Sequence, residues 1–453
     1  MKSTVRLFIV IVLLAVTFST VQAAPSKIGI NVLLNTDVTE TVLSDLGKYG
    51  TVRDVVYEIK AVTMQIVTTQ LPTIQALPYV EFAGPDQVRT GAPVDTVSVT
   101  NFTSGINTWD LDAINVTNFG AGRTIGYDGT GVYVAVLDTG LVDSWRNYFP
   151  QERIATEYAM VFGGGGGENG NVSTPTNKWE HDQNSHGTHV TSTILGYQYG
   201  TGKVNGVAPM ATVIPVKVLN QNGSGWSSAV AAGIVYVTDL KLGPLADHPI
   251  VINMSLGGPS LDPMEKSAID YAVANGVIIV ASAGNEGTAG MGYPGAYEPV
   301  ISVAASGWTG EWTAASWWRT LDVPDPTDPA DFYITDFSSR QLSGQDLDVA
   351  APGSWIVGPY QTNSGTLKLG YYYLGGTSMS SPHVAGIVAL MAQKDPTLTA
   401  PVAEAALESS AVYLAPGCRN VNDGSGNIVQ FCWGADATGA GLAVAGSALG
   451  ALP

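Results

Sequence analysis

Long apolar runs separated by amphipathic stretches dominate the central part of the chain. Uninterrupted apolar runs are typical of parallel strands that are buried on both faces of a sheet. Such runs occupy residues 131–137, 213–218, 250–254, 277–281 and 300–304. Between them the pattern changes to that of helices, most clearly at 228–240 and 263–274. This alternation predicts an α/β domain built as a three-layer α/β/α sandwich with a mostly parallel sheet.

The segment from 27 to 88 has a different pattern. An alternating strand comes first and a short strand comes last, with two amphipathic stretches and a further strand between them. These elements are expected at 28–32, 38–49, 54–59, 68–77 and 79–82. Their succession predicts the β-α-β-β-α-β order of a small α+β split βαβ module.

Residues 84–107 are polar and lack apolar periodicity. We therefore expect an exposed, cleavable connector between the small module and the large domain. The resulting boundaries place the small module at 25–83 and the large domain at 108–453.

The first residues, 1–24, form a separate segment. Lys2 and Arg6 precede an apolar run at 7–16, and small residues end the segment at Ala24. This layout predicts a cleavable secretory signal and a secreted, extracellular protein. An uncleaved membrane anchor is the alternative, although the run is short for a span of about 20 residues. No later segment suggests membrane association once the signal is removed.

The charge balance excludes some classes of partner. With 20 Lys and Arg against 38 Asp and Glu, the formal net charge is −18. Nucleic acids and anionic membranes attract basic surfaces, so neither is an expected partner. Charged residues make up only 13% of the chain, and we expect the surface to depend on Ser, Thr, Asn and Gly for its polarity.

The chain contains 2 cysteines, Cys418 and Cys432, on either side of a turn-rich stretch. In an exported protein, an even pair that brackets a hairpin predicts a disulfide. Two free, buried thiols are the alternative. Neither cysteine is placed to act as a nucleophile or as a metal ligand.

Three short segments carry a carboxylate, an imidazole and a hydroxyl in the chain order Asp, His, Ser. Asp138 lies in Val-Leu-Asp-Thr-Gly, His186 in Asn-Ser-His-Gly-Thr-His, and Ser378 in Gly-Thr-Ser-Met-Ser-Ser-Pro-His. A serine hydroxyl is a poor nucleophile until an adjacent base accepts its proton, and the base needs a third group to fix its tautomer. The three residues therefore predict a catalytic triad. Pro382 fits the first turn of a helix behind the serine.

These segments, together with Val-Ile-Asn-Met-Ser-Leu-Gly-Gly at 251–258 and Ala-Ser-Ala-Gly-Asn-Glu-Gly at 281–287, resemble the signature blocks of the subtilisin-like serine peptidases. The motifs are specific, and they span most of the large domain. The resemblance implies that Asp138, His186 and Ser378 form the triad.

The resemblance also implies the surroundings of the triad. The side chain of Asn285 and the backbone N–H of Ser378 would form the oxyanion hole. Two extended segments would hold the substrate by strand addition, and further residues would line the first side-chain pocket. These substrate-binding residues are Gly223, Ser224, Gly225, Ser255, Leu256, Gly257, Gly292 and Glu286.

The function that follows is that of a secreted serine endopeptidase with broad specificity, made as an autoprocessed precursor. Gly292 leaves the first pocket roomy, which favours large apolar residues before the cut bond. The module at 25–83 would then be an inhibitory pro-domain, with the maturation site in 84–107. Polypeptide substrates and its own pro-domain are the expected partners of a monomer.

Other interpretations stay open at the level of sequence. His186 and His189, three residues apart, are candidates for a metal pair. Asn285 is alternatively a turn residue. The module at 25–83 is alternatively a permanent binding module. For the whole chain, the rivals are a catalytically silent binding protein and an esterase of the α/β-hydrolase type. Such an esterase would need Gly-x-Ser-x-Gly and the order Ser, acid, His.

Catalysis is expected to need no cofactor, and no metal ligand is assigned. The segments at 141–147 and 195–206 depart from the family pattern, which puts its strong calcium site in doubt. An insertion at 307–336 carries tryptophans and a series of aspartates among prolines. Carboxylate oxygens can bind calcium, so a structural calcium ion is possible here. We expect a solvated acidic loop with at most a weak site. The residues concerned are Trp308, Trp312, Trp317, Trp318, Asp322, Asp325, Asp328, Asp331 and Asp336.

Overall fold

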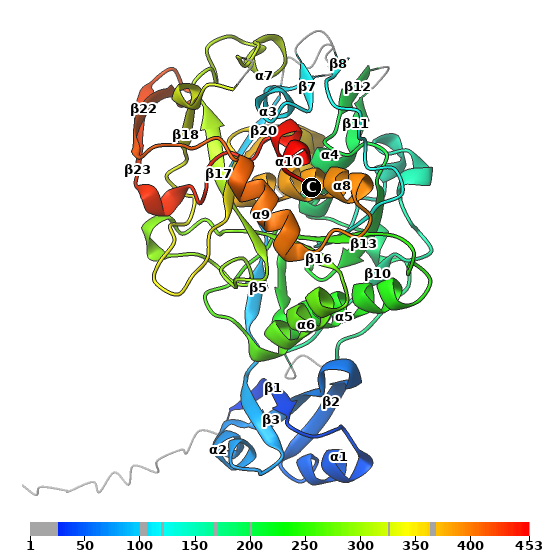
Figure 1. Cartoon of the computed structure of the whole chain (residues 1–453). Helices are drawn as coiled ribbons and strands as arrows, with labels where there is room; N and C mark the ends of the chain where they lie inside the picture. The colour runs from blue at the N-terminus through cyan, green and yellow to red at the C-terminus, as the bar shows by residue number, and fades with distance from the viewer. Residues whose placement is uncertain are drawn as a thin grey trace, which may run out of the picture.

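The computed structural model describes residues 26–99, 107–118, 122–166, 171–199, 202–324, 327–362 and 368–452. In these ranges the chain folds into a small N-terminal domain and a large domain, joined by an extended segment (Figure 1). The predicted signal at 1–24 lies outside the described residues. No helix within the described ranges is long and apolar enough to cross a membrane.

The small domain is a four-stranded antiparallel sheet with the strand order β2-β3-β1-β4. Its core contains Ile30, Met64 and Ile74 and is separate from the cores of the large domain. The β-α-β-β-α-β order is the predicted one, although β2 begins and ends earlier than expected and the sequence pattern does not locate β3. The elements are β1 (Lys27–Leu34), α1 (Glu40–Leu46), β2 (Gly50–Val56), β3 (Ala61–Val67), α2 (Leu71–Gln75) and β4 (Val80–Pro85).

An eight-stranded sheet organises the large domain, in the order β10-β13-β9-β15-β16-β17-β18, with β19 also paired to β17. Neighbouring strands are parallel except β17 and β18. Each predicted apolar run contributes a strand, so the mostly parallel sheet is confirmed. The strands are β9 (Tyr133–Asp138), β10 (Met160–Val161), β13 (Thr212–Lys217), β15 (Ile250–Met254), β16 (Ile278–Ser282), β17 (Ile301–Trp308), β18 (Phe332–Ile334) and β19 (Val349–Pro352).

Helices cover both faces of this sheet, which gives the three predicted layers (Figure 1). On one face, α5 and α6 pack against strand residues such as Leu137 and Ile252. On the other face, α4 and α8 pack against Val136 and Val280. Because both faces are covered, the strands are predominantly apolar. The helices are α3 (Trp109–Ala113), α4 (His186–Leu195), α5 (Ser227–Leu242), α6 (Pro263–Ala274), α7 (Trp317–Thr320), α8 (Thr377–Lys394), α9 (Ala400–Ser410) and α10 (Ala445–Ala451).

Short antiparallel ribbons surround the sheet. Two of them include strands of the connector: β5 pairs with β14, and β6 pairs with β21. The connector is therefore attached to the large domain on both sides of residues 91–94. The strands of the ribbons are β5 (Val88–Thr90), β6 (Asp95–Ser98), β7 (Thr117–Asn118), β8 (Gly122–Arg123), β11 (Gly196–Tyr199), β12 (Gly202–Asn205), β14 (Ser224–Trp226), β20 (Ile356–Thr362), β21 (Lys368–Gly375), β22 (Gly417–Asn422) and β23 (Ile428–Trp433).

The insertion at 307–336 belongs to the core and is not simply a solvated loop. Trp308, Trp317 and Trp318 are buried, and the ring centroid of Trp317 lies 5.9 Å from that of Tyr373. The sequence-based expectation rests on the acidic residues and misses the apolar area that the tryptophans bury. Of the aspartates, those at 322, 328 and 336 are exposed, that at 331 is half-buried, and that at 325 lies outside the described residues.

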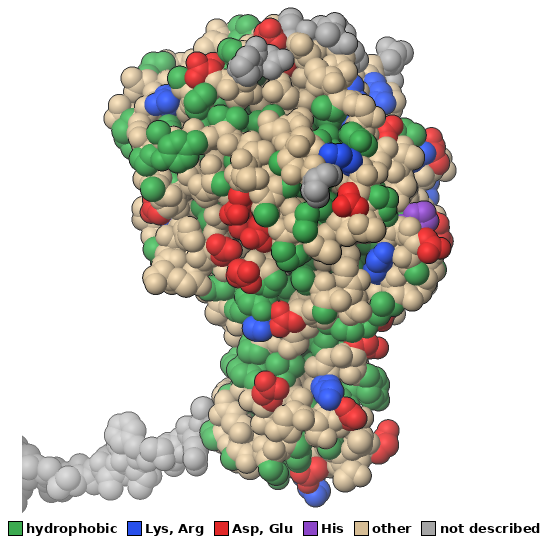
Figure 2. Space-filling model, in the orientation of Figure 1, with side chains coloured by type: hydrophobic (Ala, Val, Ile, Leu, Met, Phe, Trp, Pro, Cys, Tyr) green, Lys and Arg blue, Asp and Glu red, His purple; other side chains and the backbone are tan. Residues whose placement is uncertain are grey.

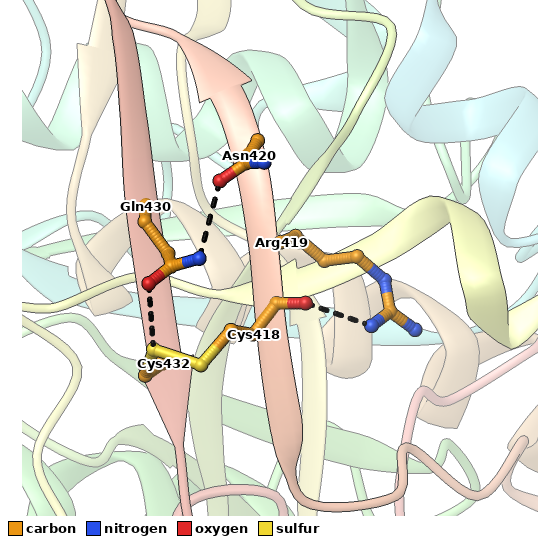
Figure 3. Close-up of a disulfide and its surroundings, with 5 residues drawn as sticks. All are labelled: Cys418, Arg419, Asn420, Gln430 and Cys432. Atoms are coloured by element: carbon orange, nitrogen blue, oxygen red, sulfur yellow. Dashed lines mark hydrogen bonds between the residues drawn. A yellow bond between two sulfur atoms is a disulfide. The ribbon is translucent and has the colours of Figure 1, made fainter.

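Near the C-terminus, β22 and β23 form a hairpin that carries the predicted disulfide (Figure 3). Cys418 and Cys432 face each other in the ladder, with their Cα atoms 4.1 Å apart and an S–S bond of 2.06 Å. Beside them, Nε2 of Gln430 donates to Oδ1 of Asn420 at 3.3 Å. The alternative of two free thiols is wrong.

Charged side chains are sparse over most of the view of Figure 2, apart from one group of acidic side chains near the middle of the large domain. Hydrophobic side chains gather where the two domains meet (Figure 2). Leu33 and Phe82 of the small domain pack into the apolar cluster that contains the inner faces of α5 and α6. The open face of the small sheet is therefore covered by these two helices.

Candidate active site

Asp138 ends β9, a strand in the interior of the sheet, so its side chain lies at the carboxyl edge. His186 begins α4, and its Nδ1 lies 2.9 Å from each carboxylate oxygen of Asp138. Both side chains are fully buried. Because a carboxylate only accepts hydrogen bonds, Nδ1 carries the proton and the lone pair of Nε2 is left to act as a base. Among the described residues, Nε2 has no hydrogen-bond partner.

Ser378 lies in the first turn of α8, which begins earlier than Pro382 suggests. A proline inside a helix removes the N–H that would bond to the carbonyl four residues before it. Here that carbonyl belongs to Ser378, and it accepts a hydrogen bond from Oγ of Ser255 at 2.8 Å. The carbonyl that Pro382 leaves free therefore links the backbone of the candidate nucleophile to a predicted substrate-binding segment.

The hydroxyl of Ser378 donates to the backbone oxygen of Ser255 at 3.2 Å. Its expected partner, Nε2 of His186, is buried nearby but not bonded to it. Catalytic hydrogen bonds of this kind are often long outside the productive complex and tighten there. The structure thus brings Asp138 and His186 together and leaves the serine–histidine hydrogen bond unformed.

Asn285 follows β16 and lies beside the start of α8. Its Oδ1 accepts hydrogen bonds from the backbone N–H and from Oγ1 of Thr377, both at 2.9 Å. Because these bonds use the amide oxygen, Nδ2 points away from Thr377. A Cβ added to Gly376 would lie 3.8 Å from Nδ2. The NH₂ group therefore lies beside the chain leading to Ser378, a position that suits a donor to a developing oxyanion.

Residues 88–94 of the connector run between the two predicted substrate-binding segments. On one side, β5 pairs antiparallel with β14, and Thr90 lies opposite Ser224. On the other side, Thr90 exchanges two backbone hydrogen bonds with Gly257, each 2.9 Å long. The connector is therefore held as a strand added between two edges, which is how extended peptides bind to proteins.

Two further backbone hydrogen bonds hold the connector beyond β5. The N–H of Gly91 donates to Gly223 O at 2.9 Å, and that of Val94 donates to Gly375 O at 2.7 Å. The expectation of an exposed connector holds for part of this stretch, where Val88, Thr90, Ala92 and Val94 are exposed, whereas Arg89 is fully buried. Its binding partners come from distant parts of the chain, and the local pattern of polar residues gives no sign of them.

Ala92 and Pro93 lie between these anchoring points. Ala92 lines the same pocket as Asn285 and Ser378. The Cα of Pro93 lies 3.7 Å from the position that a Cβ on Gly376 would take. Ala92 and Pro93 therefore lie close to the start of α8, which carries Ser378.

The pocket beside Ala92 has a volume of about 390 Å³, and its walls include Leu256 and Gly292. A Cβ added to Gly292 would come no closer than 3.6 Å to a neighbouring atom, so a side chain there would occupy pocket space without a clash. Glu286, which also lines this pocket, is exposed, and its Oε2 accepts a hydrogen bond from Oγ of Ser339 at 3.1 Å.

Several functional candidates at the junction of the domains are missed by the sequence analysis. Asp86 accepts from the backbone N–H of Ser228 at 3.0 Å, at the start of α5. Asp262 caps α6 by accepting from the N–H of Met264 at 2.8 Å, and it also accepts from Nδ2 of Asn31 at 3.0 Å. Carboxylates suit helix N-termini, where free N–H groups and the helix dipole favour them. The Asp-Pro pair at 262–263 is a recognisable helix-start signal.

His189 does not share a metal site with His186. Its Nε2 donates to the backbone oxygen of Ile356 at 3.1 Å, and burial lowers its pKa to about 3, so the ring is neutral. The other ring in this region, His383, contacts Oδ2 of Asp110 through Nε2 at 2.9 Å. Both rings make interior hydrogen bonds, as expected, although Nδ1 of His189 has no partner among the described residues.

Among the described residues, one group of three carboxylates is compact enough to hold a metal ion. Ligand atoms of Asp346, Asp348 and Glu404 lie within 4.8 Å of one another. Burial, together with neighbouring carboxylates, raises the pKa of Asp348 to about 8 and that of Glu404 to about 7. None of the three comes from the insertion at 307–336, where the weak calcium site is expected.

Comparison with known proteins gives consistent matches. A model described as the subtilase family matches residues 129–435. Subtilisin DY of Bacillus licheniformis is 36% identical over 293 residues, which is 64% of this chain and 86% of that protein. Subtilisin E of Bacillus subtilis is 36% identical over 294 residues, which is 64% of this chain but only 62% of that protein.

Solved structures show the same fold. Fervidolysin from Fervidobacterium pennivorans, described as a keratinolytic enzyme related to subtilisin, has a TM-score of 0.65 at 24% identity; the match covers 95% of this chain and 62% of that one. Sphericase has a TM-score of 0.54 at 28% identity, covering 74% of this chain and 97% of its own. The family match leaves no support for the α/β-hydrolase alternative. The chain belongs to the subtilase family and is a serine endopeptidase of the subtilisin type.

Proposed function

We propose that the chain is the secreted precursor of a broad-specificity endopeptidase that cuts its own connector. The connector supports this proposal, because its backbone lies in the cleft as a substrate would and Ala92 lines the pocket that contains Ser378. We infer that Ser378 cuts the Ala92–Pro93 bond. Backbone hydrogen bonds hold a peptide without reading its side chains, which suits varied polypeptide substrates. The signal pattern at 1–24 and the disulfide favour export, since disulfides persist in oxidising compartments. The enzyme acts as a monomer.

In the proposed reaction, Oγ of Ser378 attacks the carbonyl carbon while Nε2 of His186 takes its proton, and Asp138 stabilises the imidazolium that forms. The N–H of Ser378 and Nδ2 of Asn285 donate to the oxyanion. His186 then passes the proton to the leaving nitrogen, so the peptide bond breaks and an acyl ester remains on Ser378. Water, deprotonated by His186, hydrolyses the ester. These steps need no metal ion or cofactor.

The Ser378→Ala variant should lose casein hydrolysis, because the acyl ester cannot form. We expect its rate to fall below about 10⁻⁴ of the parent's rate. Ser380→Ala is the matched control, since this hydroxyl is buried in the same helix and has no hydrogen-bond partner among the described residues. A folded Ser378→Ala protein that digests casein as the parent does would refute the triad.

We assign the pocket beside Ala92 to the residue before the cut bond and expect it to prefer large apolar side chains. Its volume of about 390 Å³ and its apolar wall at Leu256 support this preference. The absent side chain at Gly292 supports it as well, because a larger residue there would fill the pocket. The exposed carboxylate of Glu286 adds tolerance for a basic residue.

The Gly292→Val variant should therefore keep its cleavage after alanine and lose much of its cleavage after phenylalanine. For peptides that differ only at this position, we expect kcat/KM after phenylalanine to fall at least about 10-fold relative to alanine. Gly446→Val is a control, because a Cβ there meets no atom within 4 Å. An unchanged ratio of the two substrates would show that the pocket is assigned wrongly.

We propose that the domain at 25–83 is an inhibitory pro-domain. Its sheet packs on α5 and α6, and Asp86, directly behind it, bonds to the start of α5. Its Asn31 bonds to Asp262, the cap of α6. These contacts hold the domain so that the following residues cross the cleft and exclude other substrates.

A fragment of residues 26–92 should inhibit the mature enzyme at micromolar concentration, since it contributes both the docked sheet and the strand in the cleft. A fragment of residues 26–85 should inhibit more weakly, because it lacks β5 and the residues after it. Inhibition constants of the two fragments, measured with a chromogenic peptide substrate, test whether the domain and the strand in the cleft both contribute to inhibition. Failure of the longer fragment to inhibit would favour a permanent binding module instead.

A further inference from the structure

Arg89 forms a buried ion pair with Glu265 inside the cleft. Nη2 of Arg89 lies 2.6 Å from Oε2 of Glu265, and Nε lies 3.1 Å from both carboxylate oxygens. Both side chains are fully buried. Nη2 also donates to Ser260 O at 3.0 Å, and Nη1 donates to Val88 O at 3.1 Å. The guanidinium thus has an acceptor for each of its three nitrogens.

The register of the connector gives Arg89 a defined place relative to the cut bond. Arg89 lies opposite Gly225 in the ladder of β5 and β14. It stands three residues before Ala92, so it is the fourth residue on the N-terminal side of the bond at Ser378. A substrate bound in the same register would place its own fourth residue against Glu265.

We propose that Glu265, with Gly258 and Ser260 beside it, forms an arginine pocket that selects substrates with arginine at the fourth position before the cut bond. This inference rests on the proposed function, because it requires substrates to bind as the connector does. It adds a second side-chain preference to that of the pocket beside Ala92.

The shape of the arginine pocket favours arginine over other residues. The planar guanidinium presents several donors in a fork that matches a carboxylate, whereas lysine is a single point charge. Gly258 leaves room for the guanidinium, because a Cβ at this position would lie 2.6 Å from Nη1 and 3.5 Å from Cδ of Arg89. A larger residue at this position would close the space that the guanidinium occupies.

The electrostatics of the arginine pocket point the same way. Within the described residues, Arg89 is the only cation paired with Glu265. Burial raises the pKa of the Glu265 carboxyl, and the nearby carboxylates of Asp262 and Asp86 add to this, while Arg89 opposes it. When the connector leaves, the carboxylate loses its partner. A substrate arginine would restore the pair, and an acidic residue would be repelled.

The test uses the enzyme released from the full-length chain and four chromogenic tetrapeptides that copy the connector. They have the form succinyl-Xaa-Thr-Gly-Ala-p-nitroanilide, with Arg, Lys, Leu or Glu as Xaa. We expect kcat/KM for Arg to exceed that for Leu by at least about 30-fold, with Lys between them and Glu lowest. Equal values for Arg and Leu would overturn the proposal and restrict the ion pair to docking of the connector.

Variants of Glu265 extend the test. Glu265→Gln should remove the advantage of Arg over Leu in kcat/KM. Glu265→Leu, which replaces the carboxylate with an apolar group, should reverse the order of Arg and Leu and covers the case in which the Gln variant does not fold. The control is Asp270→Asn, an exposed site on the same helix. A preference for Arg that survives both substitutions would contradict the proposal, whereas failure to hydrolyse any of the four peptides would count against the proposed function.

Discussion

The position of the connector in the cleft depends on its backbone hydrogen bonds to the two edges of the cleft. The paired bonds of Thr90 and Gly257, and the bond of Gly91 to Gly223, fix the register of the bound chain. Successive side chains of a strand point to opposite sides, so a shift by one residue would exchange every side chain between the two sides. Only the observed register places Arg89 at Glu265 and leaves Ala92 in the pocket beside Ser378.

The candidate site places polar groups where water is excluded, and each group is held by a specific contact. The carboxylate of Asp138 would be costly to bury alone, but it faces Nδ1 of His186 and also accepts the backbone N–H of Thr139 at 2.6 Å. Pro382 frees the carbonyl of Ser378 for Ser255, which anchors the first turn of α8. The geometry of the site therefore arises from strand ends and helix starts that meet at one edge of the sheet.

The sequence predicts those parts whose signal is local. The apolar runs locate five central strands, and the motifs around Asp138, His186 and Ser378 single out residues that the fold places at one edge. Sequence reasoning fails where partners are distant along the chain. Arg89 looks like part of a polar linker, and its burial becomes visible only with Glu265, 176 residues later. The prediction for the insertion at 307–336 fails for a related reason, since Trp317 packs against Tyr373, which lies far away along the chain.

The N-terminus of the mature protein tests directly whether Ser378 cuts the connector in the observed register. The active, secreted protein should be purified, and its N-terminus determined by sequencing and by intact mass. Because we infer that Ser378 cuts the Ala92–Pro93 bond, we predict a mature chain that begins at Pro93, and a Ser378→Ala chain that stays joined to its connector. An active enzyme that begins at any other residue of the connector, or that retains the connector uncut, would contradict the account.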